Sequence, residues 1–171
     1  MTISELYQLH HKLVFNLALQ YTQNIEDAEE ITQDVFVTIH YSIDQFNRTA
    51  ELRTWIYRIT INKSLDFLKA KKRKKRFGFV VSLFEIQSTS LAHSFNHPGI
   101  ELEQKEAIKN IFEAINKLNG QQKTVIILSK IEKKSQKEIA DIMSLSVKAV
   151  DSLISRAKNN LAKKLNNIEG I

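Results

Sequence analysis

The sequence predicts an all-α protein, and three observations lead to that prediction. Gly and Pro are scarce, with four Gly and one Pro in 171 residues, which argues against many strands joined by tight turns. Residue types that favour helices, such as Lys, Glu, Leu, Ile, Ala and Gln, dominate the composition. Apolar residues recur at three-, four- and seven-residue spacings in both halves of the chain. We expect two small helical domains joined by a linker.

The first half is expected to form three helices. The first covers about 3–23, and Asn24 is expected to cap the second, which covers about 25–41. A third helical stretch covers about 51–75, after a loop at 47–49. Its apolar stripe changes face midway, so this stretch either breaks there or is buried on two sides.

Residues 77–100 differ in composition from both neighbours. The segment FGFVVSLFEI (77–86) has strand-like composition, and the remainder is rich in turn residues and contains the only Pro. We interpret this stretch as a linker, and we hypothesise that its apolar part helps to pack the two domains together. Helices then resume over about 101–118 and 121–132, and the Asn-Gly pair at 119–120 is expected to end the first of them.

Charge is unevenly distributed around the net value of +6. Residues 1–68 carry 9 acidic and 5 basic side chains, whereas residues 69–76 carry 7 basic side chains and no acidic one. Residues 101–171 carry 13 basic and 9 acidic side chains. Basic segments of this kind are typical of nucleic-acid binding, although a solvated charged surface explains them equally well.

The last part of the chain has the pattern of a helix-turn-helix. Ser135 and Glu138 have the spacing of a capping box, residues 143–146 form a short turn, and Ser146 can cap the helix expected over 147–165. One face of that helix is apolar and the opposite face is small and polar, which suits a helix that enters the major groove. An ordinary three-helix bundle is the alternative. The expected inward residues are Val150, Ile154, Ala157 and Leu161.

The stretch from Leu118 to Leu165 resembles region four of extracytoplasmic-function (ECF) sigma factors, which binds the minus-35 promoter element. The family usually has Gly where Ser144 stands, and it often has basic residues where Asp151 and Leu153 stand. An Asp can still accept a hydrogen bond from cytosine N4. The resemblance implies minus-35 contacts from Lys137, Ser146, Lys148, Ala149, Ser152, Ser155 and Arg156.

The predicted second helix carries an acidic face, which suits a basic protein partner but is also compatible with plain solvent exposure. Its residues DAEEITQDVF (27–36) resemble the polymerase-binding helix of sigma region two. The resemblance implies that core RNA polymerase is bound by Asp27, Glu30, Gln33 and Asp34.

Residues 46–76 resemble the part of region two that opens and reads the minus-10 element. Capture of a flipped base needs aromatic faces, a pocket and nearby cations. Trp55 taken alone is better explained as a core residue. The basic run 71–76 is most simply explained by binding to DNA phosphates, which would make DNA binding steeply salt-dependent. The implied minus-10 contacts are Phe46, Asn47, Arg48, Arg53, Trp55, Arg58, Asn62 and Lys63.

Together the two blocks predict a domain over 1–76, a linker over 77–102 and a domain over 103–171. We expect a sigma factor that binds core RNA polymerase and directs promoter-specific initiation. The implied partners are core polymerase, promoter DNA and an anti-sigma factor. A stand-alone helix-turn-helix regulator is the alternative, and it explains 118–165 but not the acidic helix.

Other classes of protein lack their signatures here. The absence of Cys excludes disulfides, and no signal peptide or membrane-spanning run is present, so a cytoplasmic protein without membrane insertion is expected. No catalytic cluster or phosphate loop occurs, so we expect no enzyme, no cofactor and no small-molecule substrate. We expect no metal site either. The pair His10-His11 points apart on a helix, and the pair His93 and His97 has no obvious third ligand.

Overall fold

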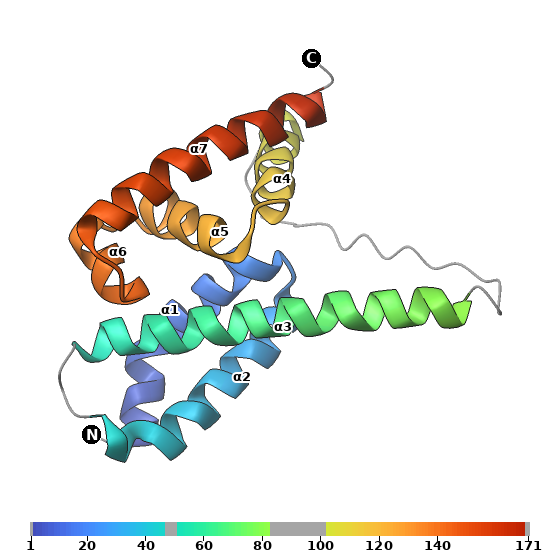
Figure 1. The fold of residues 1–171 in the computed structure, drawn as a ribbon. Helices are drawn as coiled ribbons and strands as arrows, with labels where there is room; N and C mark the ends of the chain where they lie inside the picture. Colours follow the sequence, from blue (N-terminus) through green and yellow to red (C-terminus); the bar gives the residue numbers. More distant parts are fainter. Residues whose placement is uncertain (1, 47–50, 83–101, 170–171) are drawn as a thin grey trace. The chain divides into compact units, whose positions relative to one another are not determined.

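The structure, a computed structural model, describes residues 2–46, 51–82 and 102–169 (Figure 1). Every regular element in these ranges is helical, so the all-α prediction is confirmed. The helices are α1 (Ile3–Thr22), α2 (Ile25–Ser42), η1 (Ile43–Gln45), α3 (Leu52–Ser82), α4 (Leu102–Asn116), α5 (Gly120–Ile126), η2 (Ile127–Ile131), α6 (Gln136–Met143) and α7 (Val147–Glu169).

The chain forms two compact units, each described here by itself. Unit 1 comprises Met1–Ile43 and Ile59–Asn96, and unit 2 comprises Asp44–Arg58 and His97–Ile171. Helix α3 therefore contributes its first turns to unit 2 and its remainder to unit 1.

Unit 1 is built on the packing of α1 against α2. Asn24 caps α2 as expected, because its side chain accepts the backbone N–H of Asp27 at 2.7 Å. Thr2 and Glu5 form a capping box at the start of α1, a feature that the sequence analysis did not include. Each fully buried aliphatic side chain contributes roughly 1.5–3 kcal/mol to the stability of such a core. Those with least exposure are Leu6, Val14, Leu17, Ile31, Val35 and Ile39.

Helix α3 runs without interruption, so the alternative of a break midway is wrong. The other alternative, burial on two sides, is not supported either, because the buried side chains fall within one arc of about 140° at 100° per residue. They are Ile56, Tyr57, Thr60, Ile61 and Ser64. The helix also continues to Ser82, so the strand-like composition that begins at residue 77 does not form a strand over 77–82. The remainder of the predicted linker, 83–101, lies outside the described residues.

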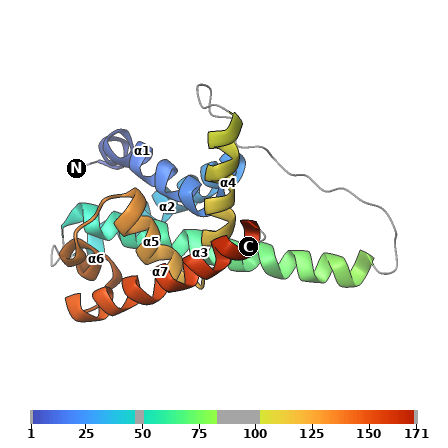
Figure 2. The same cartoon turned by 90° about the horizontal axis from the view of Figure 1, so that it is seen from above.

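In unit 2, helix α7 packs against α4, α5 and α6 (Figures 1 and 2). Val150 and Ala157 of α7 are fully buried, as the helix-turn-helix pattern predicted, and so is Ile139 of α6. Ile154 is nearly buried, and Leu161 is only half-buried. The short helices thus gain their stability from one long amphipathic helix rather than from their own length.

The helices of unit 2 differ in two places from the prediction. Helix α4 already ends at Asn116. Asn119 caps the start of α5, because its side chain accepts the backbone N–H of Gln122 at 2.9 Å. The prediction that the Asn-Gly pair at 119–120 ends a helix is therefore wrong, since the pair begins one. The predicted helix over 121–132 changes to π-helical hydrogen bonding at η2. A π-helical turn adds a residue without breaking the helix, which changes the direction in which the chain leaves it.

Candidate functional site

The helix-turn-helix is held by the predicted capping box. The Ser135 hydroxyl accepts the backbone N–H of Glu138 at 3.2 Å, and the Glu138 carboxylate accepts the backbone N–H of Ser135 at 2.8 Å. Lys134 pairs with the same carboxylate at 2.9 Å. The Ser135 backbone N–H, together with Lys134 and the Ser135 hydroxyl, lowers the pKa of Glu138 from 4.5 to about 2.

The turn between α6 and α7 is tight and requires an unusual backbone conformation. Ser144 has φ 56°, in the left-handed region, and stands where the related family usually has glycine. The backbone N–H of Leu145 then bonds the Ala140 carbonyl at 3.0 Å, and Ser146 caps α7 by accepting the backbone N–H of Ala149 at 3.1 Å. The turn therefore fixes the angle at which α7 leaves α6.

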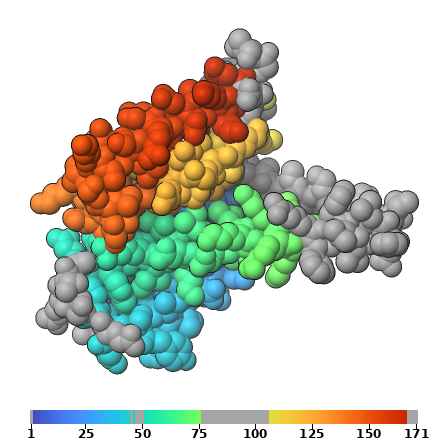
Figure 3. Space-filling model, viewed as in Figure 1, coloured from blue at the N-terminus to red at the C-terminus, as the bar shows by residue number. Residues whose placement is uncertain are grey.

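The predicted reading face lies on the outer side of α7, and α7 forms much of the visible surface of unit 2 in Figure 3. Ala149 is half-buried and Leu153 is buried, so Leu153 cannot take the place of a basic contact residue. Asp151 is exposed and accepts a hydrogen bond from Gln136 of α6 at 3.0 Å, which ties the two helices together. The exposed members of the predicted set are Lys137, Ser146, Lys148, Ser152, Ser155 and Arg156.

The predicted polymerase-binding residues of α2 fall into two groups. Glu30, Gln33 and Asp34 are exposed on one side of the helix. Asp27 instead forms an ion pair with Lys71 of α3, and its side chain is only 16% exposed. Asp27 is therefore largely neutralised within unit 1, while the other three remain available to a partner.

The predicted minus-10 residues at the start of α3 form an aromatic pair with neighbouring cations. Phe46 and Trp55 are half-buried, and their ring centroids lie 5.1 Å apart. Arg53 and Asn62 are exposed, and Lys63 is half-buried. Asn47 and Arg48 lie outside the described residues.

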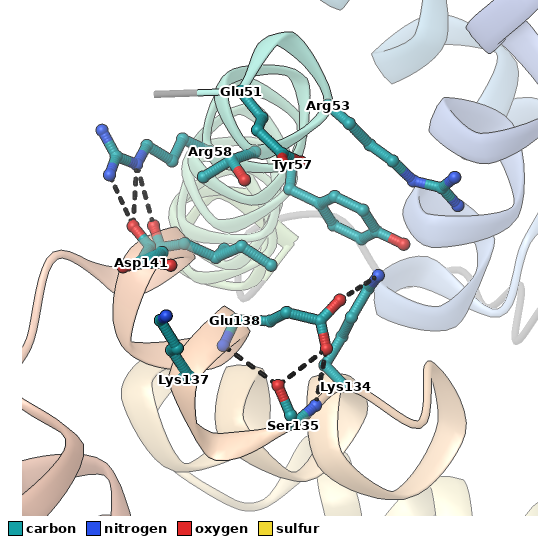
Figure 4. Close-up of a pocket in the computed structure, with 11 residues that line it drawn as sticks. Glu51, Arg53, Tyr57, Arg58, Lys134, Ser135, Lys137, Glu138 and Asp141 are labelled. Atoms are coloured by element: carbon teal, nitrogen blue, oxygen red, sulfur yellow. Dashed lines mark hydrogen bonds and ion pairs between the residues drawn. The ribbon is translucent and has the colours of Figure 1, made fainter. Parts of the chain in front are cut away.

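Unit 2 contains a polar pocket of about 450 Å³ between the first turns of α3 and the start of the helix-turn-helix (Figure 4). Arg58 reaches across it, and its Nε lies 3.2 Å from the carbonyl oxygens of both Asp141 and Ile142. These carbonyls belong to the last turn of α6, where helix carbonyls lack intrahelical partners and the helix dipole favours a cation. Arg58 therefore caps the carboxyl end of α6.

Tyr57 makes the second link across this pocket. Its hydroxyl donates to the Glu132 carboxylate at 2.6 Å, and the Lys134 ammonium lies 5.2 Å from the centre of its ring. Burial, followed by the hydrogen bond to Glu132, raises the pKa of Tyr57, so the hydroxyl keeps its proton and remains a donor.

Two family models match the chain in sequence order. The model for sigma-70 region 2 matches residues 6–74, and the model for sigma-70 region 4 matches residues 108–161. The chain belongs to the sigma-70 family. The matches fall on the acidic helix with the aromatic pair and on the helix-turn-helix, which are the two blocks whose resemblance was noted in the sequence.

Relatives of this sigma factor place it in the ECF group, as predicted. It is 25% identical over 169 residues to the ECF RNA polymerase sigma factor SigW of Bacillus subtilis. The matched region covers 96% of this chain and 89% of that relative. It is 27% identical over 140 residues to CnrH of Cupriavidus metallidurans, covering 81% and 73% of the two chains. The ECF RNA polymerase sigma-E factor of Escherichia coli K12 is 26% identical over 141 residues, covering 81% and 74%.

Solved structures share the fold of this sigma factor. CnrH in complex with the cytosolic domain of CnrY matches with a TM-score of 0.65 and 24% identity, over 96% of this chain and 88% of that chain. RpoE of Bartonella quintana in complex with the anti-sigma factor NepR matches with a TM-score of 0.63 and 21% identity, over 95% and 96%.

The residues that link α3 to the helix-turn-helix were not predicted from the sequence of this sigma factor. They are Tyr57, Glu132 and Lys134. The Tyr57–Glu132 hydrogen bond joins residues 75 positions apart, and no periodicity in the sequence indicates such a pair. The Lys71–Asp27 pair was missed for the same reason, since 44 positions separate its members.

Over 2–46, 51–82 and 102–169, no three His, Asp or Glu side chains are grouped so that they could hold a metal ion. Over the same part of the chain, no helix has the length and apolar character needed to cross a membrane. His93 and His97 lie outside the described residues.

Proposed function

We infer that this sigma factor binds core RNA polymerase and directs it to promoters. The observation that carries this inference is the order of two family matches, region 2 before region 4, on a chain whose second unit presents a capped helix-turn-helix. A stand-alone helix-turn-helix regulator is not favoured, because it would leave the region 2 match without a role.

We propose that polymerase docks on the exposed part of the α2 acidic face. Glu30, Gln33 and Asp34 support this proposal because they are exposed and share one side of the helix. Asp27 contributes less to docking, because Lys71 already neutralises it. A basic partner surface would lose attraction with each reversed charge.

The decisive experiment measures binding of the purified chain to bacterial core polymerase, followed by promoter-dependent initiation. Asp34→Lys and Glu30→Lys should each weaken polymerase binding at least tenfold. Asp66→Lys is the matched control, because it makes the same change of charge at an exposed position of α3 outside the proposed face. Equal weakening by Asp34→Lys and Asp66→Lys would refute the assignment of the face, and absence of any binding would refute the function.

We propose that the aromatic pair and its neighbouring cations receive the melted minus-10 strand. Trp55 is the only tryptophan of this chain, so 5-fluorotryptophan incorporated into it gives one fluorine resonance that unlabelled polymerase does not share. Single-stranded minus-10 DNA added to the polymerase-bound protein should shift that resonance, and Asn62→Ala should weaken the response without changing the binding of polymerase. An unchanged tryptophan signal in a competent complex would place the strand elsewhere.

We propose that the outer face of α7 reads duplex minus-35 DNA. Lys148 and Arg156 are exposed and suit phosphates, while Ser152 and Ser155 are small enough to let the helix approach base edges. Ser152→Glu places a negative charge on the reading face and should abolish minus-35 protection in footprinting. Gln121→Glu, which adds the same charge at an exposed position of α5, is the control.

We also propose an anti-sigma partner, cytoplasmic action and the domain boundaries 1–76 and 103–171. RpoE of Bartonella quintana, which shares the fold, was solved with an anti-sigma factor. The chain would act by binding alone, without a chemical step of its own. A purified candidate anti-sigma protein should inhibit promoter-dependent initiation when it is added to this chain before core polymerase. A candidate that leaves initiation unchanged is not the anti-sigma partner.

A further inference from the structure

The outer face of α7 carries an acidic side chain that the proposed minus-35 contacts leave unused. Asp151 is exposed and stands in the second turn of the helix, near the end whose residues contact base edges in a helix-turn-helix. It follows Lys148 by three residues and precedes Ser155 by four, so at 100° per residue it lies within about 60° of both. A duplex that α7 approaches through these two neighbours therefore also meets the carboxylate.

The carboxylate of Asp151 is held in place but is not neutralised. Its Oδ1 accepts a hydrogen bond at 3.0 Å from the Nε2 of Gln136, the first residue of α6. Among the described residues, Asp151 has no ion-pair partner and its Oδ2 has no hydrogen-bond partner. The bond between the two helices thus restrains one oxygen, while the second oxygen remains an acceptor for a ligand.

A carboxylate without a cation on a DNA-binding surface costs affinity, because it is repelled by the phosphates that Lys148 and Arg156 are proposed to bind. The base edges differ in whether they repel it as well. In the major groove, cytosine N4 and adenine N6 are amino groups that donate hydrogen bonds, whereas guanine O6 and N7 and thymine O4 are acceptors. The free oxygen of Asp151 can therefore be satisfied by cytosine or adenine, and it is repelled by guanine or thymine.

We propose that Asp151 selects the base at one position of the minus-35 element, where it accepts a hydrogen bond from the amino group of cytosine or adenine and rejects guanine and thymine. The inference rests on the proposed function, because it requires that α7 enters the major groove of that element. Gln136 is a positioning residue, which acts through the oxygen that it bonds. Repulsion thus adds to specificity here, at a position where the family that the sequence resembles often has a basic residue.

Initiation on a randomised promoter library tests the proposal. Core RNA polymerase carrying the full chain transcribes duplex templates randomised over the minus-10 and minus-35 segments, and barcodes in the transcripts give the base preference at every position. At one minus-35 position, on one strand, the parent should favour cytosine and adenine over guanine and thymine by at least about fivefold, the lower end of what a base contact provides. Asp151→Asn keeps an oxygen for Gln136 but replaces the second acceptor by a donor. The preference should then be lost, and templates with guanine or thymine should gain activity.

Three further variants separate base selection from charge and from folding. Asp141→Asn removes the same negative charge at an exposed position of α6 and should leave the base preference unchanged. Asp151→Arg supplies donors at the proposed position and should reverse the preference to guanine, a gain that a folding defect cannot produce. Gln136→Ala should weaken the preference at that minus-35 position and leave the minus-10 preference unchanged.

The outcomes distinguish the inference from the function on which it rests. If the parent supports no initiation with core polymerase, the sigma function falls, and the inference falls with it. If the parent initiates but Asp151→Asn keeps the same base preference at every position, Asp151 only ties α7 to α6 and base selection is refuted. The same change of preference in Asp141→Asn would also refute it, because the effect would then come from charge alone.

Discussion

Two non-glycine residues take the left-handed conformation at the boundaries of α6. Lys133 has φ 54° in the connection before α6, and Ser144 has φ 56° in the turn after it. Ser144 stands where the family that the sequence resembles usually has glycine. A side chain in this conformation costs on the order of 1 kcal/mol, so each turn is strained relative to a glycine version.

Replacing Ser144 by glycine is therefore expected to stabilise unit 2. Ser144→Gly should raise the free energy of unfolding by about 0.5–1 kcal/mol, because it relieves the left-handed strain at a smaller entropic cost. Urea denaturation followed by circular dichroism measures the change. Ser155→Gly is the matched control, and at its exposed helical position the same replacement should lower the free energy of unfolding by roughly 0.5 kcal/mol. Equal signs for the two variants would contradict the explanation.

At the scale of elements, α6 depends on its capping box, because eight residues are too few to form a stable helix alone. Ser135→Ala removes the side-chain acceptor for the Glu138 N–H and should lower the free energy of unfolding by about 1 kcal/mol. Thr38→Ala is a control, since the Thr38 hydroxyl bonds only its own helix, at the Asp34 carbonyl. If Ser135→Ala lowers the free energy of unfolding no more than Thr38→Ala does, water replaces the capping hydrogen bond without loss of stability.

The lowered pKa of Glu138 gives this cap a defined pH dependence. Because the folded-state pKa of about 2 lies below the ordinary value of 4.5, the ionised carboxylate stabilises unit 2 above pH 4.5. That contribution is lost as the pH falls from 4.5 towards 2. The difference in unfolding free energy between the parent and Glu138→Gln should be largest at neutral pH and should shrink through this window. A difference that stays constant from pH 6 to pH 3 would contradict the assignment.

The elements whose signals are local were predicted correctly from the sequence. The capping box at Ser135 and the caps at Asn24 and Ser146 each depend on residues at most three positions apart, and all three caps form. The continuation of α3 through residues 77–82 was missed, because aromatic and β-branched residues favour strands locally while a preceding helix extends at little cost. The Arg58 and Tyr57 contacts depend on residues brought together only by folding, and no local pattern encodes them.

At the scale of the whole molecule, the charge distribution separates two kinds of partner. The acidic side chains of α2 and the basic run at 71–75 occur in the same unit, and Lys71 is the member of that run that pairs with Asp27. Residues 72–75 are exposed. The cations of the run are therefore not equally available to DNA, because Lys71 already forms an ion pair with Asp27.

This inequality predicts different salt dependences for two neighbouring lysines. Lys72→Ala should reduce the slope of log affinity for promoter DNA against log salt concentration by roughly 0.7–0.9, the contribution of one phosphate contact. Lys71→Ala should reduce the slope by less, because its charge is offset by Asp27. Fluorescence anisotropy of the polymerase complex between low and moderate salt measures both slopes. Equal reductions would mean that Lys71 leaves Asp27 when DNA binds.

The unbroken course of α3 also fixes the distance between the two places where this helix is proposed to meet DNA. From Asn62 to Lys72 the helix advances about 15 Å, at 1.5 Å per residue. Successive cations of the run 71–75 stand about 100° apart and are all exposed, so together they surround the helix. One alanine inserted between Lys69 and Ala70, beyond the buried positions Ile61 and Ser64, would turn the run by about 100° and bring a neighbouring cation to the place of the displaced one. Four inserted alanines would move the run about 6 Å farther from Asn62. A promoter strand that must meet both places at once should therefore tolerate the single insertion better than the fourfold one, so that distance along the axis, and not rotation about it, decides where this helix can hold DNA.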